Sequence, residues 1–122
     1  MKKLIAVLLV LSLVTALVVA CGGSSGSTTD VHMSSTNFVQ SSVTISKGSS
    51  LNLIDDAAVT HNIMNGSWMN GTAKPMTESG APTVSQQFQG NESHTIGPFN
   101  TAGTFHLYCT IHQNMNLTVI VQ

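Results

Sequence analysis

Short β-branched segments separated by turn signals are the feature that most constrains the fold of this chain. From residue 30 onward these segments follow one another at short intervals, and no long stretch carries the apolar spacing of an amphipathic helix. Asn-Gly pairs at 65–66 and 70–71 predict tight turns, and Gly90-Asn91 predicts a hairpin turn. We therefore expect one all-β domain over residues 30–122, built as a sandwich or barrel of seven or eight strands.

Apolar and polar residues alternate within these segments, which predicts a core between two layers of strands. The same alternation places Tyr108 on the outward face of its strand, as a surface aromatic. The pair Asp55-Asp56 is expected to form a solvated turn, and the polar segment 74–83, with two prolines, is expected to be a loop. The expected core consists of Phe38, Val43, Ile45, Leu53, Ile63, Phe88, Ile96, Phe105, Leu107, Leu117, Val119 and Val121.

The first twenty residues differ in character from this domain. Two lysines precede an apolar run over residues 4–20 that ends in small residues, which is the layout of a secretory signal peptide. Cys21 follows in the sequence VVAC, which resembles the bacterial lipobox, where the signal is cut before a lipid-modified cysteine. The rest of segment 21–29 is rich in Gly, Ser and Thr and predicts a flexible linker.

A retained transmembrane anchor is the alternative to cleavage, because the seventeen residues of the apolar run reach the lower limit of a membrane span. Either arrangement places the folded domain outside the cytoplasm and close to a membrane. The anchor that we expect is the lipid on Cys21, since that cysteine stands directly between the apolar run and the linker.

Charge and cysteine content narrow the function further. After residue 20 the chain keeps Lys47 and Lys74 against five carboxylates, a net charge of −3, and a chain without basic clusters is not expected to bind nucleic acid. The chain has two cysteines, so a lipid on Cys21 would leave Cys109 without a disulfide partner. A lone thiol outside the cytoplasm is expected to be buried or bound to a metal.

The stretch FHLYCTIHQNM, residues 105–115, concentrates three potential metal donors. Alternation along the strand turns Cys109 toward the core, and His112 and Met115 follow on the same short loop. Two imidazoles, one thiolate and a weak axial thioether are the ligands of a blue-copper electron-transfer site. Zinc is a weaker alternative because it rarely binds a thioether. A buried cysteine beside incidental histidines is the structural alternative.

The second imidazole must come from elsewhere in a chain with five histidines. His61 is the preferred candidate, because it follows a strand and precedes Asn62, whose amide could bond to the ligand loop. Single histidines without partners are rarely ligands, so His32, His94 and His106 are expected to be surface or satisfied imidazoles.

Together these segments resemble the ligand regions of the cupredoxins, the type 1 blue copper proteins. THNIM (60–64) and FNTAGTFHLYCTIHQNMNLTVIVQ (99–122) show His-Asn, a Gly-containing turn, an aromatic strand, Cys-x-x-His-x-x-Met and a closing strand. They are most similar to the short-loop type of amicyanin and plastocyanin-like domains, over residues 30–122. The resemblance implies a Greek-key β-sandwich that holds one type 1 copper ion. The ligands that it implies are His61, Cys109, His112 and Met115.

The resemblance also assigns roles around the metal. Asn62 would brace the cysteine loop from outside the ligand set. Gln113 departs from the pattern where a proline is common, and Asn116 departs where a glycine often follows the methionine. Both departures concern loop rigidity and reduction potential, and neither removes a ligand.

These features predict a monomeric electron-transfer protein that cycles one copper ion between Cu(II) and Cu(I). Anchored through Cys21, it would meet membrane redox proteins in brief encounters across small interfaces. A module for copper delivery or sequestration is the alternative. An enzyme such as a multicopper oxidase or nitrite reductase would need His-x-His clusters, which this sequence lacks, so no catalytic activity is expected.

Overall fold

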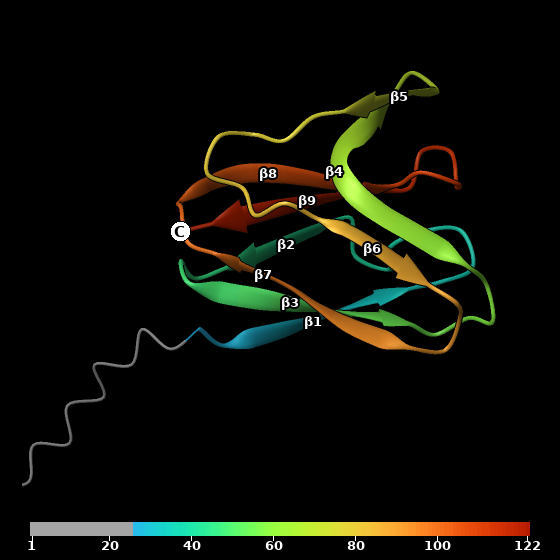
Figure 1. Ribbon diagram of the computed structural model, residues 1–122, viewed down its shortest axis with the longest axis horizontal. Helices are drawn as coiled ribbons and strands as arrows, with labels where there is room; N and C mark the ends of the chain where they lie inside the picture. The colour runs from blue at the N-terminus through green and yellow to red at the C-terminus, as the bar shows by residue number, and fades with distance from the viewer. Residues whose placement is uncertain (1–25) are drawn as a thin grey trace, which may run out of the picture.

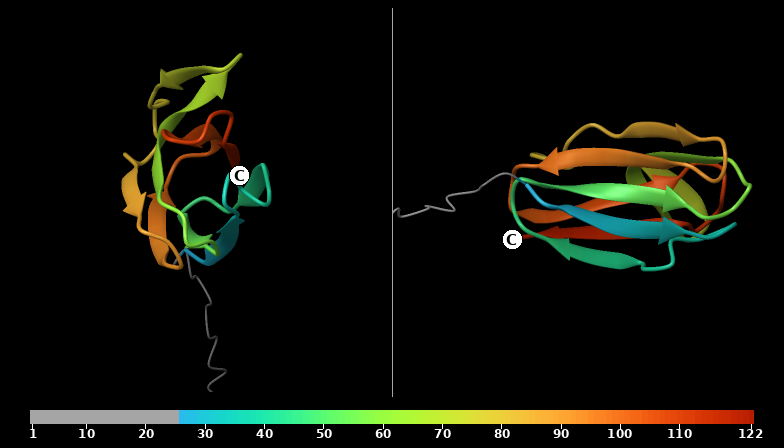
Figure 2. Two further views of the ribbon diagram at one scale, coloured as in Figure 1. Left: turned by 90° about the vertical axis from the view of Figure 1, so that its right-hand side faces the viewer. Right: turned by 90° about the horizontal axis from the view of Figure 1, so that it is seen from below.

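The computed structural model describes residues 26–122, which form a sandwich of two β-sheets (Figures 1 and 2). The expected all-β sandwich is confirmed, with nine strands instead of seven or eight. The signal peptide assigned to residues 1–20 and the lipidation site Cys21 lie outside the described residues. The strands are β1 (Thr28–Met33), β2 (Ser42–Ile45), β3 (Ser49–Asp55), β4 (His61–Met69), β5 (Thr72–Pro75), β6 (Ser85–Phe88), β7 (Ser93–Phe99), β8 (Gly103–Cys109) and β9 (Asn116–Val121).

The two sheets differ in size. One has three strands in the order β1-β3-β7, and the other follows the order β2-β9-β8-β4-β5, with β6 also paired to β4. The pairs β1–β3 and β2–β9 are parallel, whereas the other pairs are antiparallel. Parallel neighbours cannot be joined by a tight hairpin. The chain therefore leaves β1, contributes β2 to the opposite sheet, and returns as β3, which ties the two layers together.

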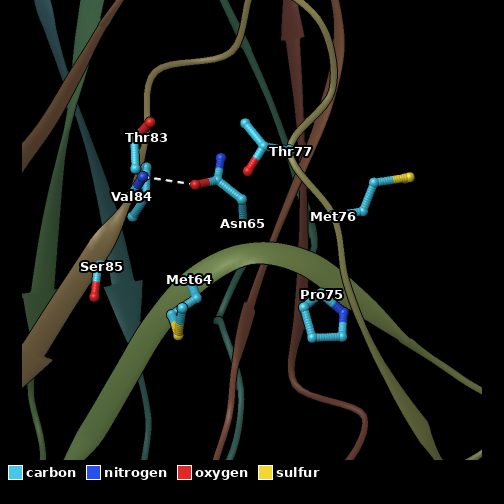
Figure 3. A pocket seen from close by; sticks show the side chains of 8 residues that line it. All are labelled: Met64, Asn65, Pro75, Met76, Thr77, Thr83, Val84 and Ser85. Carbon is cyan, nitrogen blue, oxygen red and sulfur yellow. Dashed lines mark hydrogen bonds between the residues drawn. The ribbon is translucent and has the colours of Figure 1, made fainter.

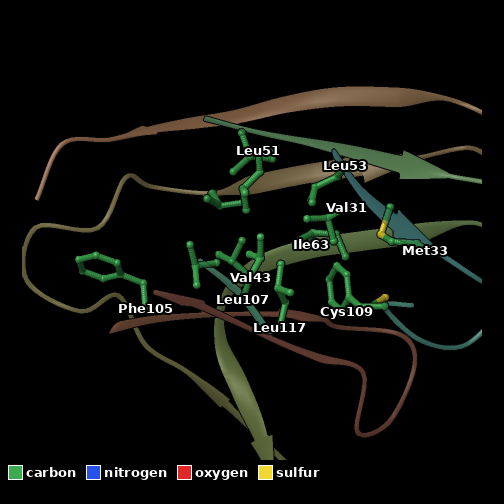
Figure 4. Packing of buried hydrophobic residues seen from close by; sticks show 14 of the residues in the cluster. Val31, Met33, Val43, Leu51, Leu53, Ile63, Phe105, Leu107, Cys109 and Leu117 are labelled. Carbon is green, nitrogen blue, oxygen red and sulfur yellow. The ribbon is translucent and has the colours of Figure 1, made fainter. Parts of the chain in front are cut away.

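The core lies between the two sheets (Figure 4). All twelve residues predicted for the core are buried. Strict alternation explains this result, because β3 and β9 each present every second side chain to the interior. Cys109 is fully buried at one end of the cluster and Phe105 lies toward the other end (Figure 4).

The two poles of the sandwich carry different parts of the chain. At one pole, Lys47 N–H donates to the Gln122 carbonyl at 3.0 Å, and Ser50 N–H donates to the Ser27 carbonyl at 2.9 Å. The first described residues and the C-terminus therefore lie at the same pole (Figure 1). The loop that joins β8 to β9 lies at the opposite pole (Figure 1).

Strand β4 corrects one predicted turn. The Asn65-Gly66 pair lies inside this continuous strand rather than in a hairpin. The Asn65 side chain is buried, where its Nδ2 donates to the Pro82 carbonyl at 3.0 Å and its Oδ1 accepts the Val84 N–H at 2.6 Å. Gly66 has φ of +131°, and a Cβ there would meet the Lys74 carbonyl oxygen at 2.4 Å, so the strand bends sharply at this residue. Segment 82–84, distant in the sequence, supplies the hydrogen-bond partners that water would supply to the Asn65 side chain in an exposed turn.

Two other predicted turns are confirmed. Asn70 and Gly71 both have positive φ, at 52° and 75°, and they join β4 to β5. Gly90 and Asn91 also have positive φ and lie between β6 and β7.

Two boundaries differ from expectation. Strand β5 begins before the segment expected to be a loop and takes its first two residues, Lys74 and Pro75. Strand β1 begins at Thr28, two residues before the domain boundary expected from the sequence.

Two residues expected at the surface are buried. Tyr108 is only 3% exposed, because Trp68 of β4 packs edge-on against its ring at a centroid distance of 6.1 Å. Asp55 is 2% exposed, at the end of the alternating face that it shares with Leu51 and Leu53. Its neighbour Asp56 is exposed as expected.

Within residues 26–122, no helix is long and apolar enough to cross a membrane.

Candidate metal centre

The loop between β8 and β9 is tied across its base by backbone hydrogen bonds. Cys109 N–H donates to the Met115 carbonyl at 3.0 Å, and Met115 N–H donates to the His112 carbonyl at 3.2 Å. Asn114 has φ of +65°, which turns the chain back toward β9. Three potential donors are thereby confined to one pole of the sandwich.

His61 comes from a different part of the sequence and meets this loop through strand register. In the antiparallel pair β4–β8, Ile63 lies opposite Cys109, so His61 at the start of β4 lies beside the end of β8. The Nδ1 atom of His61 lies 3.7 Å from the Sγ of Cys109. On the other side, the Nδ1 atom of His112 lies 3.4 Å from the same sulfur.

These three donors have the spacing of a trigonal metal site. One ligand atom from each of His61, Cys109 and His112 lies within 4.8 Å of the others, and the two imidazole rings are 4.8 Å apart at 57°. Two sides of the donor triangle measure 3.7 and 3.4 Å, and the third is no longer than 4.8 Å, so a single metal ion can contact all three donors. First-row metals bind imidazole and thiolate at about 2.0–2.3 Å. The donor set therefore fits a copper ion, which accepts both ligand types.

The hydrogen bond made by the Nε2 atom of His61 determines which ring nitrogen carries the proton. The Nε2 atom lies 3.0 Å from the Ser34 carbonyl oxygen, which can only accept, so Nε2 carries the proton and Nδ1 is free to bind a metal. The Asp55 carboxylate lies 3.6 Å from the same Nε2 and favours the same tautomer. Burial lowers the pKa of His61, partly offset by the nearby Asp55 carboxylate and reinforced by His112. The neutral imidazole that a metal requires is therefore favoured.

Asn62 joins β4 to the ligand loop at three points. Its Nδ2 donates to the Thr110 Oγ1 at 2.9 Å, and its carbonyl accepts the Thr110 N–H at 2.9 Å. Its own N–H points to the Cys109 Sγ at 3.5 Å. The bracing contact expected of this amide is present, and a hydrogen bond to sulfur restrains the thiolate position.

Met115 is fully buried at the end of the loop, immediately before β9. It belongs to the same buried cluster as Cys109. The Met115 thioether is therefore withdrawn from solvent.

The remaining described histidines lie outside the donor cluster. His32 pairs with Asp56 at 2.7 Å, His94 with Glu92 at 3.4 Å, and His106 with Glu78 at 2.6 Å. Each ring therefore has a carboxylate partner, as expected for histidines that are satisfied without a metal.

A cavity of about 330 Å³ lies away from the donors, between β4 and the segment that follows β5 (Figure 3). Its lining includes Met64, Met76 and Val84, and the Asn65 side chain reaches across it to the Val84 N–H (Figure 3). The lining contains no ionisable side chain. This cavity therefore offers no second set of charged ligands.

Sequence reasoning missed several contacts that shape the centre. Trp68 Nε1–H donates to the Cys109 carbonyl at 2.8 Å, and Asp55 and the Ser34 carbonyl support His61. Alternation with Leu51 and Leu53 was a signal that Asp55 faces the interior. The hydrogen bond of Trp68 had no local signal, because its partner is 41 residues away.

Comparisons with known proteins bear on the fold and on the metal. A family model for copper-binding proteins of the plastocyanin/azurin family matches residues 26–122. Amicyanin from Paracoccus versutus (Thiobacillus versutus) is similar with a TM-score of 0.59 and 20% identity, over 78% of this chain and 81% of that chain. A purple cupredoxin from Nitrosopumilus maritimus gives 0.58 and 16% identity, over 77% and 99% of the two chains. A search of curated proteins finds no significant match.

At these identities the similar structures show a shared fold alone. The family match bears on the metal as well as on the fold, because the matched residues include all nine strands and the three clustered donors. The sulfur and imidazole donors are ligands that suit copper, so the copper cofactor predicted from the sequence is confirmed. The chain belongs to the plastocyanin/azurin family of copper-binding proteins.

Proposed function

We propose that this protein is a single-electron carrier with one type 1 copper ion. The ligands would be the Nδ1 atoms of His61 and His112, the Cys109 thiolate, and Met115 as a weak axial thioether. The observation that carries the proposal is the approach of both Nδ1 atoms to one buried sulfur, at 3.7 and 3.4 Å. When bound, copper supplies the Cu(II)/Cu(I) couple that the protein itself lacks.

The protein's own part is to hold the donors still and to keep water away from them. Cys109 and His61 are both 0% exposed. The sulfur is restrained by the Asn62 N–H, and the His61 ring is fixed by the Ser34 carbonyl. Donors fixed in this way need little rearrangement when the charge of the centre changes, which lowers the reorganisation cost of electron transfer.

The same burial argues against copper delivery or sequestration as the main role. A delivery site exchanges its metal quickly, which requires donors that an acceptor can reach. Here the sulfur and one imidazole are fully buried, and only His112 is partly exposed among the three clustered donors. An electron, unlike an ion, can leave through a partly exposed imidazole without opening the site.

Location and partners are part of the same proposal. The signal-like residues 1–20 and Cys21 support export and lipid anchoring, so we place the carrier outside the cytoplasm at a membrane. Redox partners would bind as transient contacts with a monomer. Ile111, beside His112, is 55% exposed and offers an apolar surface for brief contact.

The test is the visible spectrum of the purified protein with Cu(II). We expect an intense blue charge-transfer band that Cys109→Ser abolishes, because the band requires the thiolate. His106→Ala is the matched control and should leave the band intact, since His106 lies outside the donor cluster and pairs with Glu78. Stoichiometric Cu(II) binding without a strong visible band would contradict a type 1 centre.

A further inference from the structure

The β4–β5 hairpin approaches the ligand loop from outside the sandwich. Strand β4 pairs with β8 only over Ile63–Asn65, then bends at Gly66 and continues with β5 alone. The bend carries the hairpin back toward the pole with the loop between β8 and β9 (Figures 1 and 2). This hairpin is not needed to close the core, since its strands β4 beyond Gly66 and β5 contribute no residue to the buried cluster.

Four side-chain hydrogen bonds join the hairpin to the ligand loop and its flank. Trp68 Nε1–H donates to the Cys109 carbonyl at 2.8 Å. The Asn116 amide bonds to both backbone groups of Trp68, accepting its N–H at 2.7 Å and donating to its carbonyl at 3.0 Å. Gln113 Nε2 donates to the Gly71 carbonyl at 3.1 Å. These contacts reach the first residue, the middle and the C-terminal flank of the loop.

We infer that the β4–β5 hairpin is a clamp that holds the ligand loop in its metal-binding geometry before any metal arrives, with Trp68 as its principal positioning residue. The inference rests on the proposed function, because the loop is the one proposed to hold copper. Within residues 26–122, Trp68 makes no hydrogen bond to any of the proposed donor atoms. It acts through the Cys109 carbonyl and through edge-on packing against Tyr108.

The clamp complements the contacts of Asn62. Asn62 holds Thr110 and the Cys109 sulfur from the start of β4. The hairpin, at the end of the same strand, holds the carbonyl side of Cys109 and the flank of the loop. One strand therefore holds the loop at two separate places, and a loop fixed on both sides opens less often than a loop tied only at its base.

The first experiment uses the metal-free protein and measures hydrogen exchange of loop amides. Trp68→Phe keeps an aromatic ring beside Tyr108 but loses the indole donor, so exchange at Cys109, Thr110 and Met115 should rise about fivefold. Asn116→Ala should have a similar effect without altering Trp68 itself. Amides of Leu117 and Val119 in β9 should not change.

The second experiment measures release of Cu(I) to a competing chelator. Trp68→Phe and Asn116→Ala should keep the blue band and release copper several-fold faster than wild type. Met69→Ala is the matched control on the same hairpin, because the Met69 side chain is exposed to solvent. Val121→Ala, at the opposite pole, controls for general destabilisation.

The outcomes separate the clamp from the proposed function. Unchanged loop exchange in both Trp68→Phe and Asn116→Ala would overturn the clamp, even in a protein with a normal blue band. Equal acceleration by Val121→Ala would also overturn it, because the effect would then be global. A wild-type protein without a blue band would overturn the proposed function, while exchange in the metal-free protein would still decide the clamp.

Discussion

His61 is supported on its non-ligand side by two groups that accept hydrogen bonds. The Ser34 carbonyl lies 3.0 Å from Nε2, and the buried Asp55 carboxylate lies 3.6 Å from it. Asp55 Oδ1 also accepts the Ala57 N–H at 3.1 Å, and its Oδ2 has no partner among the described residues. A carboxylate on the far side of a ligating imidazole makes the ring a stronger donor.

Replacing this carboxylate tests its contribution. Asp55→Asn keeps the shape but removes the charge, and we expect copper affinity to fall about tenfold in a competition titration. Asp56→Asn changes the adjacent, exposed carboxylate and should have no comparable effect. Equal losses in the two variants would assign the effect to overall charge instead of to the contact with His61.

The buried His61 ring also makes the stability of the metal-free protein depend on pH. Burial lowers its pKa in the folded state, so the unfolded chain takes up the proton first as the pH falls below the ordinary value of about 6.5. The free energy of unfolding should therefore decrease between that value and the lower pKa of the folded state, by at most about 1.4 kcal/mol per pH unit.

Urea unfolding of wild type and His61→Gln at several pH values checks this expectation. The variant lacks the titrating ring, so its stability should change less over the same interval. The other histidines are common to both proteins and cancel in the comparison. Parallel pH profiles would show that His61 does not bind protons differently in the two states.

At the scale of elements, β4 shows both the reach and the limit of sequence reasoning. The pattern around Cys109 predicted the potential donors of the loop because they are neighbours in the chain. The twelve residues predicted for the core are all buried, but the core also contains Val31, Met33, Leu51, Val84 and Phe99, which that prediction did not name. The tight turn predicted at Asn65-Gly66 was wrong, because Asn and Gly favour both a hairpin turn and a bend inside a strand. The choice between them is made by segment 82–84, whose groups satisfy Asn65. Tyr108 was expected at the surface because its packing partner, Trp68, lies in a distant part of the sequence.

Gly66 is the residue on which this bend depends. In Gly66→Ala a Cβ would lie 2.4 Å from the Lys74 carbonyl oxygen, at a φ of +131° that disfavours L side chains. We expect a loss of about 1–3 kcal/mol in the free energy of unfolding, measured with urea. Ser67→Ala, the next position on the strand, is the control and should be close to neutral. If Gly66→Ala left the free energy of unfolding unchanged, the bend would not depend on glycine at this position.

At the scale of the whole molecule, the donor triangle joins two distant parts of the chain. His61 begins β4, whereas Cys109 ends β8 and His112 follows it in the loop. A metal bound to all three can stay bound only while β4 and β8 remain paired. Binding should therefore stabilise the global fold, and not the loop alone.

Thermal unfolding with and without copper measures this linkage. Free metal at about 100 times its dissociation constant adds about 2.7 kcal/mol, so the melting temperature should rise on loading and fall again when a chelator removes the metal. Cys109→Ser should lose most of the shift. A melting temperature that does not respond to copper in the wild-type protein would show that the three donors do not bind the metal together.

The N-terminal end of the domain and the loop between β8 and β9 lie at opposite poles, which matters for an anchored molecule. Everything before residue 26 joins the domain beside the C-terminus, with the full length of the sandwich between that point and His112. A lipid on Cys21 would thus tether the domain by the pole opposite His112, which leaves the imidazole free to face away from the bilayer surface. Electron donors and acceptors would then be reached best if they project well above the lipid headgroups or diffuse in the surrounding aqueous space.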